Sequence, residues 1–246
     1  MNESYNKTVL ITGASRGLGA ATARVFAKNK YNVILNCLNN TEIANKLADE
    51  LKEKYSIKTL VLPFDVSKEE EVLKNIEIAY KEFNTIDVLV NNAGIAIDST
   101  LEDKTVNNFK RTLDVNLIGP FLMCKYIGKR MYEEKKGSII NVSSTNSIDS
   151  FYPYSIDYDA SKAGVNILTH DFAKEYAPYV KVNTIAPGWI NTEMNKELDK
   201  EYIEEECQHI LLNRFAEPEE IAEEIYHIAN SSYLNDSIIK VDGGRC

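Results

Sequence analysis

The chain has 246 residues, a formal net charge of −9, and hydrophobic and charged fractions of 44% and 26%. These values are ordinary for a globular protein and exclude disordered, collagen-like and disulfide-stapled classes. The acidic balance argues against a nucleic acid or an anionic membrane as partner, because both attract excess Lys and Arg. Only 11 residues are glycine, below the usual share of about 7%, so glycine is expected where the backbone demands it.

Short β-rich runs alternate with longer helical patterns along the chain. Strands are predicted at Thr8–Thr12, Val33–Cys37, Lys58–Phe64, Asp87–Asn91, Ser138–Val142, Lys181–Ala186 and Ser237–Val241. Helices are predicted at Gly17–Asn29, at Thr41–Tyr55 with Thr41 as its cap, from a Ser67 cap to about Phe83, at about Val106–Glu134, at Tyr158–Tyr176, and in patterns up to about Asn230. Apolar strands alternating with helices predict an α/β fold, a doubly wound, Rossmann-like single domain over residues 1–246. Its seven-stranded parallel sheet carries helices on both faces.

The sequence carries few signs of a compartment or a metal. No apolar run follows a basic start as in a secretory signal, and none approaches the ~20 residues that span a bilayer. The four cysteines and three histidines are scattered without the spacing of zinc ligands. We therefore expect a cytoplasmic protein with free thiols, no metal site and no membrane partner.

A glycine-rich turn, TGASRGLG at residues 12–19, joins the first strand to the first helix. Gly13 allows a tight exit from the strand, Gly17 allows the backbone to approach a pyrophosphate, and Gly19 allows close helix packing. The helix N-terminus adds N–H groups and partial positive charge. The turn therefore predicts a dinucleotide site; a turn that binds nothing is the alternative. The predicted contacts are Gly13, Ser15, Arg16, Gly17, Leu18 and Gly19.

The end of the second strand bears on which dinucleotide binds. An NAD site usually carries Asp or Glu there, to bind the ribose 2′-OH, but the stretch Asn36–Asn40 (NCLNN) holds no acid. Arg16 is placed to meet a 2′-phosphate. We therefore predict NADP(H), with Asn36 among its contacts. In the alternative, Arg16 only caps the turn and Asn36 or Asn39 binds a 2′-OH.

A tyrosine and a lysine stand four residues apart in YDASK at 158–162. On a helix Tyr158 and Lys162 share a face, and a nearby ammonium lowers the pKa of a phenol. Such a tyrosine exchanges a proton with an alcohol oxygen near neutral pH. Tyr132 and Lys136 have the same spacing, but their charged surroundings are typical of a solvated surface. Tyr158 instead follows the fifth strand, on the edge where doubly wound folds bind ligands.

Three more strands end in glycine-bearing or polar segments. NNAG at 91–94 suits the floor of a cofactor cleft, and a hydroxyl of NVSS at 141–144 is placed to hydrogen-bond a substrate oxygen. In PGWINT at 187–192, the backbone of Ile190 and the hydroxyl of Thr192 are placed to hold a carboxamide. The predicted cofactor contacts of these segments are Asn92, Ala93, Gly94, Pro187, Gly188, Ile190 and Thr192.

These motifs, with Asn116 in DVN and with VDGG at 241–244, resemble the short-chain dehydrogenase/reductase family over essentially the full length. The resemblance implies an oxidoreductase with a catalytic tetrad of Asn116, Ser144, Tyr158 and Lys162. Tyr158 would be the general acid in reduction, and Ser144 would orient the carbonyl. Lys162 would tune Tyr158 and bind the nicotinamide ribose. Asn116 would hold a water in a proton relay.

Within the family, the chain most resembles the 3-oxoacyl-acyl-carrier-protein reductases of fatty acid biosynthesis, through TGASRGLG, NRFAEPEEIA at 213–222 and VDGG. This implies reduction of a 3-oxoacyl thioester to a secondary alcohol by NADP(H). The family's adenine contact corresponds to Asp65, which Val66 follows. The substrate would be a small molecule or an acyl thioester, possibly on acyl carrier protein. For that acidic carrier, the candidate basic patch is Lys129, Arg130, Lys135 and Lys136, diluted by Glu133 and Glu134.

The sequence departs from those reductases near the catalytic residues. The gap from Ser144 to Tyr158 is one residue longer than usual, which leaves Ser143 as an alternative to Ser144. Asp157 and Asp159 flank Tyr158 and would oppose phenolate formation if they approached its oxygen.

Two further questions stay open at this point. Ile95, Ala96, Ile97 and Trp189 are expected to line the substrate pocket, which leaves a sugar or polyol dehydrogenase or a general carbonyl reductase as alternatives. A non-catalytic NADP(H)-binding protein is the alternative from another class. The helices at about 106–134 and 158–176 match the pair by which family members associate, so a homotetramer or homodimer is expected.

Overall fold

The computed structural model describes residues 6–150, 152–195 and 198–245. Within these residues a parallel sheet of seven strands runs in the order β3-β2-β1-β4-β5-β6-β7. The strands are β1 (Thr8–Ile11), β2 (Asn32–Cys37), β3 (Thr59–Pro63), β4 (Val88–Asn91), β5 (Gly137–Val142), β6 (Val180–Pro187) and β7 (Ile238–Val241). In the central register Ile11 lies between Leu35 and Val90. The order reverses between β1 and β4, which places a crevice at their carboxyl ends.

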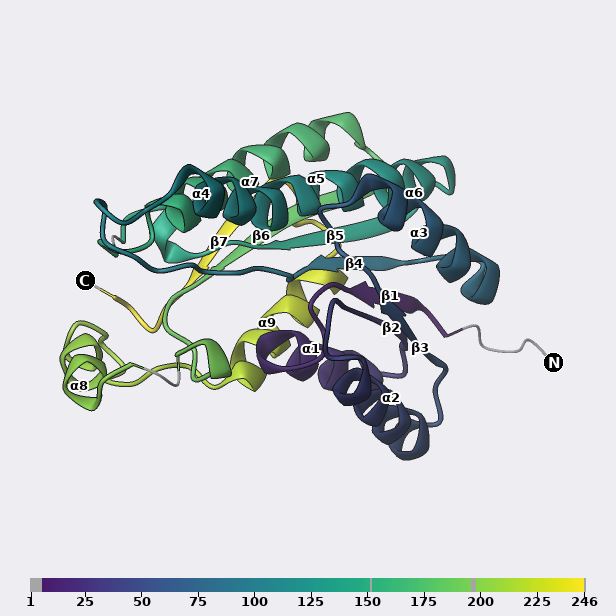
Figure 1. Ribbon diagram of the computed structural model, residues 1–246. Coiled ribbons are helices and arrows are strands. Elements are labelled where there is room, and N and C mark those ends of the chain that lie inside the picture. Colours follow the sequence, from purple (N-terminus) through teal and green to yellow (C-terminus); the bar gives the residue numbers. More distant parts are fainter. Residues whose placement is uncertain (1–5, 151, 196–197, 246) are drawn as a thin grey trace.

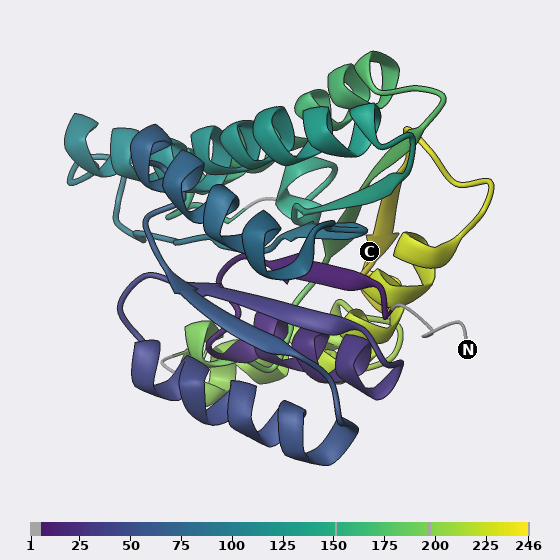
Figure 2. The ribbon, with the colours of Figure 1, turned by 90° about the vertical axis from the view of Figure 1, so that its right-hand side faces the viewer.

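Helices cover both faces of the sheet, as the two views in Figures 1 and 2 show. One layer contains α1 (Gly17–Lys28), α2 (Thr41–Tyr55) and α9 (Pro218–Asn230); the other contains α3 (Glu69–Phe83), α4 (Val106–Leu113), α5 (Gly119–Met123), α6 (Lys129–Glu133) and α7 (Ile156–Glu175). Each layer has its own apolar core, with Phe26 and Ile225 in one and Ile76 and Met123 in the other. Helix α8 (Lys200–Gln208) stands apart at the carboxyl edge (Figure 1). The prediction of a doubly wound, Rossmann-like sheet is confirmed.

The long helix predicted over about 106–134 is not continuous. Wider π-helical turns, Asp114–Ile118 and Cys124–Gly128, separate α4, α5 and α6. Gly119 follows the first and Gly128 ends the second: a Cβ on Gly119 would come within 2.8 Å of Val66, and one on Gly128 within 2.4 Å of Tyr176. A hydrophobic period does not reveal one-residue expansions of a turn, so the sequence could not show them.

Two predicted helix caps are wrong. Asn40, not Thr41, is the N-cap of α2, and no side chain caps that end. Helix α3 begins at Glu69, and Ser67 donates instead to the carboxylate of Asp65, at 2.7 Å. Several other predicted boundaries shift by one or two residues, as is usual for element ends.

The apolar character of the helices and the state of the cysteines are two further properties of the described residues. No helix in the described residues has the length and apolar character needed to cross a membrane. Cys37, Cys124 and Cys207 are free thiols, and Cys246 lies outside the described residues.

Candidate active site

The carboxyl ends of the central strands open into a cleft of about 710 Å³. The predicted catalytic and cofactor-binding residues come from eight separate segments of the chain, and every one of them lines this cleft except Asn116. Asn116 is fully buried beside it. Sequence positions scattered from Gly13 to Thr192 therefore converge on one place, at the switch point of the sheet.

The glycine turn between β1 and α1 forms one wall of the cleft. Gly13 and Gly17 have φ of +65° and +54°, which L side chains rarely adopt, and a Cβ on Gly19 would lie 2.3 Å from the carbonyl oxygen of Gly13. Helix α1 begins at Gly17 with no side-chain cap and no acid in its first turn. Its first N–H groups are therefore available to an anion, which fits a dinucleotide pyrophosphate.

Residues of the glycine turn and at the end of β2 bear on whether the site accepts a ribose 2′-hydroxyl or a 2′-phosphate. Arg16 is exposed at the cleft and makes no ion pair within the described residues. Asn36 also lines the cleft, but its amide oxygen accepts from Gly13 N, and its nitrogen donates to the carbonyls of Leu62 and Phe64. This side chain therefore braces the glycine turn. Arg16, Asn39 and Asn40 also line the cleft, and none of the three has a side-chain hydrogen bond or ion pair within the described residues, so Arg16 and the predicted alternative Asn39 are both available to a ligand.

Asp65, the predicted adenine contact, is tied into the edge of the cleft. Its carboxylate accepts from Ser67 at 2.7 Å and pairs with Arg111 at 3.1 Å. Burial acts to raise the pKa of Asp65, but the hydrogen bonds from Ser67 and the nearby Arg111 outweigh it and lower the pKa. The carboxylate is held ionised and in one orientation.

Tyr158, Ser144 and Lys162 meet at the centre of the cleft. Tyr158 lies in the first turn of α7 and forms a hydrogen bond with Ser144. The Lys162 ammonium lies 5.4 Å from the centre of the Tyr158 ring and donates to the Val142 carbonyl at 2.8 Å. The tyrosine hydroxyl and the serine hydroxyl are thus paired, with a buried cation beneath the ring.

The ionisation of this group differs from the sequence prediction. Burial, together with Asp159 and Asp98, raises the pKa of Tyr158 to about 12, although the hydrogen bond with Ser144 lowers it. Burial also lowers the pKa of Lys162, to about 8. The predicted lowering of the pKa of Tyr158 is therefore wrong here, because desolvation is the largest effect and outweighs the hydrogen bond with Ser144. At neutral pH Tyr158 keeps its proton and is poised to donate it.

The two adjacent serines have different surroundings. Ser143 is buried, and its hydroxyl donates to the Lys162 carbonyl at 3.1 Å and lies 3.0 Å from the Ser147 hydroxyl. Ser144 is half-buried and lines the cleft, with its hydroxyl accepting from Asn146 N and bonded to Tyr158. Ser144 is therefore the serine that faces a ligand beside Tyr158.

Asn116 supports the floor of the cleft from behind. Its amide accepts from Ile95 N at 2.8 Å and donates to Ile95 O at 2.9 Å. A Cβ on Gly94 would lie 3.5 Å from the Asn116 amide oxygen and 3.6 Å from the Lys162 ammonium nitrogen. Glycine at this position therefore keeps the space between Asn116 and Lys162 free of a side chain.

The segment after β6 forms the opposite wall. Gly188 allows contact with the last strand, because a Cβ there would lie 2.8 Å from Asp242. The Ile190 carbonyl accepts from Thr192 N and from the Asn195 amide. Its N–H makes no backbone hydrogen bond within the described residues. The arrangement fits the predicted amide contact near Thr192.

The substrate end of the cleft joins the predicted Trp189 to residues that sequence reasoning missed. Rings of Tyr152, Trp189 and Tyr202 stand about 6 Å apart at edge-to-face spacing, and Tyr152 and Trp189 line the cleft. Glu206 accepts from Trp189 at 2.6 Å and pairs with Arg245 at 2.7 Å. No local motif marks Tyr152, Tyr202, Glu206 or Arg245, because they meet only in the folded chain. The predicted lining residue Ile97 is not part of the wall.

Comparison with known proteins agrees with this geometry. A family model described as short chain dehydrogenase matches residues 7–203. A 3-oxoacyl-[acyl-carrier-protein] reductase from Synechocystis sp. is 36% identical over 242 residues, which are 97% of this chain and 96% of that protein. Glucose 1-dehydrogenase 2 from Bacillus subtilis is 33% identical over 244 residues, 97% of this chain and 94% of that one.

Solved structures are similar in the same way. "ElxO with NADP Bound" matches with a TM-score of 0.88 and 32% identity, over 97% of this chain and 98% of that chain. A 3-oxoacyl-[acyl-carrier protein] reductase with bound NAD from Brucella melitensis matches with a TM-score of 0.89 and 27% identity, over 98% and 92%. The chain belongs to the short-chain dehydrogenase family and is an oxidoreductase, as its motifs predicted.

Proposed function

We propose that the protein reduces a ketone to a secondary alcohol with NADPH, and that the ketone is a 3-oxoacyl thioester. The observation that carries this is the hydrogen-bonded pair of Ser144 and Tyr158 on the wall of the cleft, with Lys162 beneath it. Bound NADP(H) would supply the hydride. The pyrophosphate would lie against the glycine turn and α1, and a 2′-phosphate against Arg16.

The residues of the chain account for the remaining chemistry. Ser144 donates a hydrogen bond to the carbonyl oxygen and orients it. Tyr158, protonated at neutral pH, gives its proton to that oxygen as negative charge develops there. Lys162 favours the phenolate that forms, and the open space above Gly94 links it to Asn116. Asn116 also holds Ile95 in place, so it acts on the site through the wall as well as through the relay.

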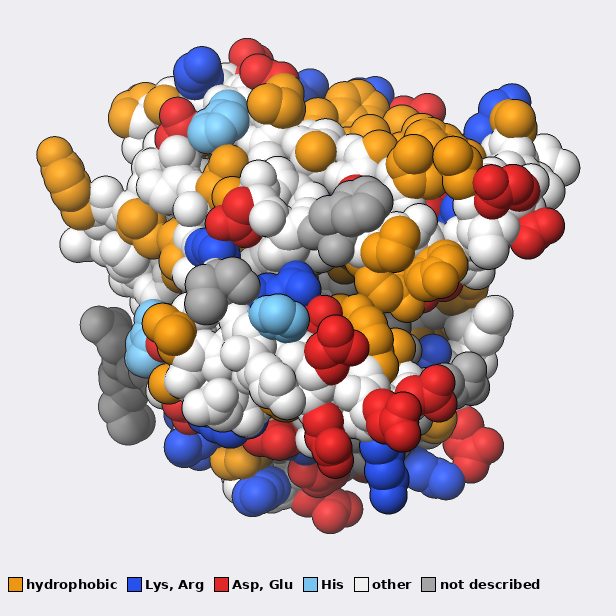
Figure 3. All heavy atoms as spheres, turned by 90° about the vertical axis from the view of Figure 1, so that its left-hand side faces the viewer, with side chains coloured by type: hydrophobic (Ala, Val, Ile, Leu, Met, Phe, Trp, Pro, Cys, Tyr) orange, Lys and Arg blue, Asp and Glu red, His pale blue; other side chains and the backbone are white. Residues whose placement is uncertain are grey.

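The thioester part of the proposal is supported by the relatives that act as 3-oxoacyl-[acyl-carrier-protein] reductases. The predicted basic patch for an acidic carrier is partly neutralised, because Arg130 pairs with Glu77 and Lys136 pairs with Asp87. The face of the molecule seen in Figure 3 also carries a group of Asp and Glu side chains in its lower part. These observations favour a small free thioester over one borne by a carrier.

A sugar or polyol dehydrogenase is the second candidate, because the Bacillus subtilis relative is a glucose 1-dehydrogenase. The closing experiment follows NADPH oxidation with an acetoacetyl thioester free in solution, with the same group on acyl carrier protein, and follows NADP⁺ reduction with glucose. We expect the free thioester to react fastest and Tyr158→Phe to lose about 10²–10⁴-fold in kcat. Equal rates for wild type and Tyr158→Phe would contradict the mechanism, and faster turnover of glucose would contradict the substrate.

The protein is also expected to associate as a homodimer or homotetramer through α4–α6 and α7. Ile118, Phe121 and Ile167 are exposed apolar side chains on these helices. Gly164 of α7 packs against Leu117 of its own chain, because a Cβ there would lie 2.8 Å from that side chain. Light scattering at micromolar concentration tests this expectation, and a monomer would contradict it.

A further inference from the structure

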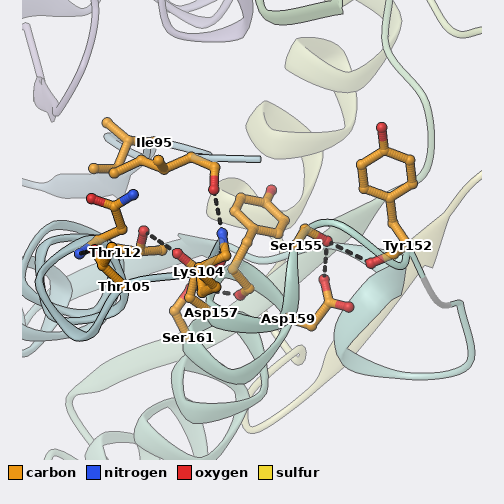
Figure 4. Close-up of polar contacts among 12 residues, drawn as sticks. Ile95, Lys104, Thr105, Thr112, Tyr152, Ser155, Asp157, Asp159 and Ser161 are labelled. Atoms are coloured by element: carbon orange, nitrogen blue, oxygen red, sulfur yellow. Dashed lines mark hydrogen bonds and ion pairs between the residues drawn. The ribbon is translucent and has the colours of Figure 1, made fainter. Parts of the chain in front are cut away.

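An ion pair lies buried beside the cleft, outside the catalytic group. The Lys104 ammonium pairs with the Asp157 carboxylate at 2.9 Å, and their side chains are 4% and 0% exposed. The second carboxylate oxygen accepts from the Thr112 hydroxyl at 2.7 Å. Lys104 also donates to the carbonyl of Ile97. Figure 4 shows Lys104 between the segment above it and the carboxylate below it.

The pair joins two parts of the chain that bound the cleft from different sides. Lys104 ends the loop between β4 and α4, whereas Asp157 lies in the first turn of α7, next to Tyr158. Thr112 adds the last turn of α4 to the same carboxylate. Three elements are thus fixed around one buried charge pair.

The loop held by Lys104 is a wall of the cleft. Ile95, Ala96 and Asp98 line the cleft. Ile97 lies between them in the sequence, and its carbonyl accepts a hydrogen bond from Lys104. Asn116 holds Ile95 on the other side. The position of this wall relative to Tyr158 therefore depends on two anchors that both reach the helix of Tyr158. Lys104 reaches it through Asp157, and Asn116 reaches it by donating to the Ser161 hydroxyl at 3.2 Å.

Stability alone is a weak reason for such a pair. Taking two charges out of water costs about as much as their attraction returns, and apolar replacements are often neutral or stabilising. The pair does fix a geometry, and it neutralises a carboxylate adjacent to the proton donor. The other carboxylate next to Tyr158, that of Asp159, accepts from the Ser155 hydroxyl (Figure 4) and from the Asn146 amide. Asp98 faces Tyr158 from the loop, and Lys162 lies beneath the ring.

We propose that Lys104 and Asp157 are positioning residues for carbonyl reduction: their ion pair fixes the substrate-side wall at 95–98 against the helix that carries Tyr158. This inference rests on the proposed function. It predicts that loss of the pair lowers turnover while leaving the dinucleotide end of the cleft intact.

The test compares wild type with Lys104→Met, with Lys104→Met/Asp157→Asn, and with Ile76→Ala, a core variant of α3 remote from the cleft. Thermal stability, the Kd of NADPH, kcat and KM are measured with whichever ketone the wild type reduces fastest, and hydrogen exchange is followed over residues 95–104. For Lys104→Met we expect kcat/KM at least about tenfold lower, NADPH affinity within about twofold, and faster exchange in 95–104.

The double variant separates position from stability and also serves if the single variant fails to fold. It removes the unpaired carboxylate, so it should recover stability, yet its kcat/KM should stay at least about fivefold low because Ile97 still lacks its anchor. Ile76→Ala should lose stability with kcat within about twofold of wild type. Wild-type turnover in the double variant would overturn the proposal, as would unchanged exchange over 95–104 in Lys104→Met. If the wild type reduced no ketone, the proposed function and the role in carbonyl reduction would fail, and the exchange comparison between Lys104→Met and Ile76→Ala would still decide whether the pair fixes the wall at 95–98.

Discussion

The two ends of the cleft are built in different ways. The dinucleotide end is made mostly of backbone: the turn with Gly13 and Gly17 at positive φ, the uncapped start of α1, and the N–H of Ile190, which has no backbone acceptor within the described residues. The substrate end is made of side chains that reach one another from distant segments, such as Lys104 with Asp157 and Glu206 with Arg245. Backbone that must come close to a ligand requires glycine in fixed spacing, so it leaves a signature in the sequence. Side-chain pairs across loops require no spacing and leave none.

The largest effect expected from testing this contrast concerns the two serines. Ser144→Ala removes the hydroxyl that faces the substrate oxygen, and we expect kcat to fall about 10²–10³-fold. Ser143→Ala removes a buried hydrogen bond to the Lys162 carbonyl, which should cost about 1 kcal/mol of stability with little change in kcat. Steady-state kinetics and urea unfolding of both variants measure the two quantities. A larger loss of kcat in Ser143→Ala than in Ser144→Ala would reverse the assignment.

The glycine turn offers the next largest effect. A Cβ on Gly17 would meet Thr192 at an ordinary 3.6 Å, but φ is +54°, so valine there strains the backbone at the pyrophosphate. We expect Gly17→Val to weaken NADPH binding by about ten- to 100-fold, measured by fluorescence titration. Lys30→Val is the matched control, because Lys30 has φ of 64° beyond the far end of α1. The comparison between the two ends fails if Lys30→Val weakens binding as much.

Lys162 links chemistry to stability and pH. Burial lowers its pKa from 10.5 to about 8, so between these values the unfolded chain binds more protons, and stability rises with pH. Below pH 8 the full cost of a buried ammonium is present. Lys162→Met should therefore be about 2 kcal/mol more stable than wild type at pH 7, after the lost hydrogen bond to Val142 is counted. The gain should shrink as the pH rises from about 8 to 10.

Urea unfolding at pH 7 and at higher pH checks this expectation. Lys58→Met, at an exposed position, is the control, and its stability relative to wild type should not change in that range. A constant difference between Lys162→Met and wild type would contradict the linkage.

The smallest effect concerns the choice of dinucleotide. Arg16→Ala should reduce the preference for NADPH over NADH by about tenfold, because one charge-assisted contact to a 2′-phosphate is lost. Arg24→Ala, on the same helix and paired with Glu50, should leave the preference unchanged. The ratio of kcat/KM for the two cofactors is the measurement. If Arg16→Ala left the ratio of kcat/KM for NADPH and NADH unchanged, Arg16 would not select the dinucleotide, and the residues after β2 would be the remaining candidates.

The fold and the dinucleotide end could be predicted because their signals are local. The apolar strands, the helical periodicity and TGASRGLG are each recognised within a short stretch of consecutive residues. YDASK places Tyr158 and Lys162 about one helical turn apart. The predicted roles of these residues remain to be tested. What could not be predicted depends on distance in the sequence or on burial. Lys104 and Asp157 are 53 residues apart, and the inward turn of Asn36 toward Leu62 and the raised pKa of Tyr158 follow from packing that no motif encodes.

The two π-helical turns between α4 and α6 have a consequence for how this region tolerates change in length. Each is equivalent to one extra residue in an otherwise regular helix, and a helix advances about 100° per residue. Deleting one residue from Asp114–Ile118 would restore regular winding but rotate Gly119 away from Val66 and bring a larger neighbour to a place with no room for a Cβ. The same holds for Gly128 and Tyr176 at the second turn. The rotation of the helix about its axis is thus fixed at two points. This region should accept substitutions more readily than insertions or deletions.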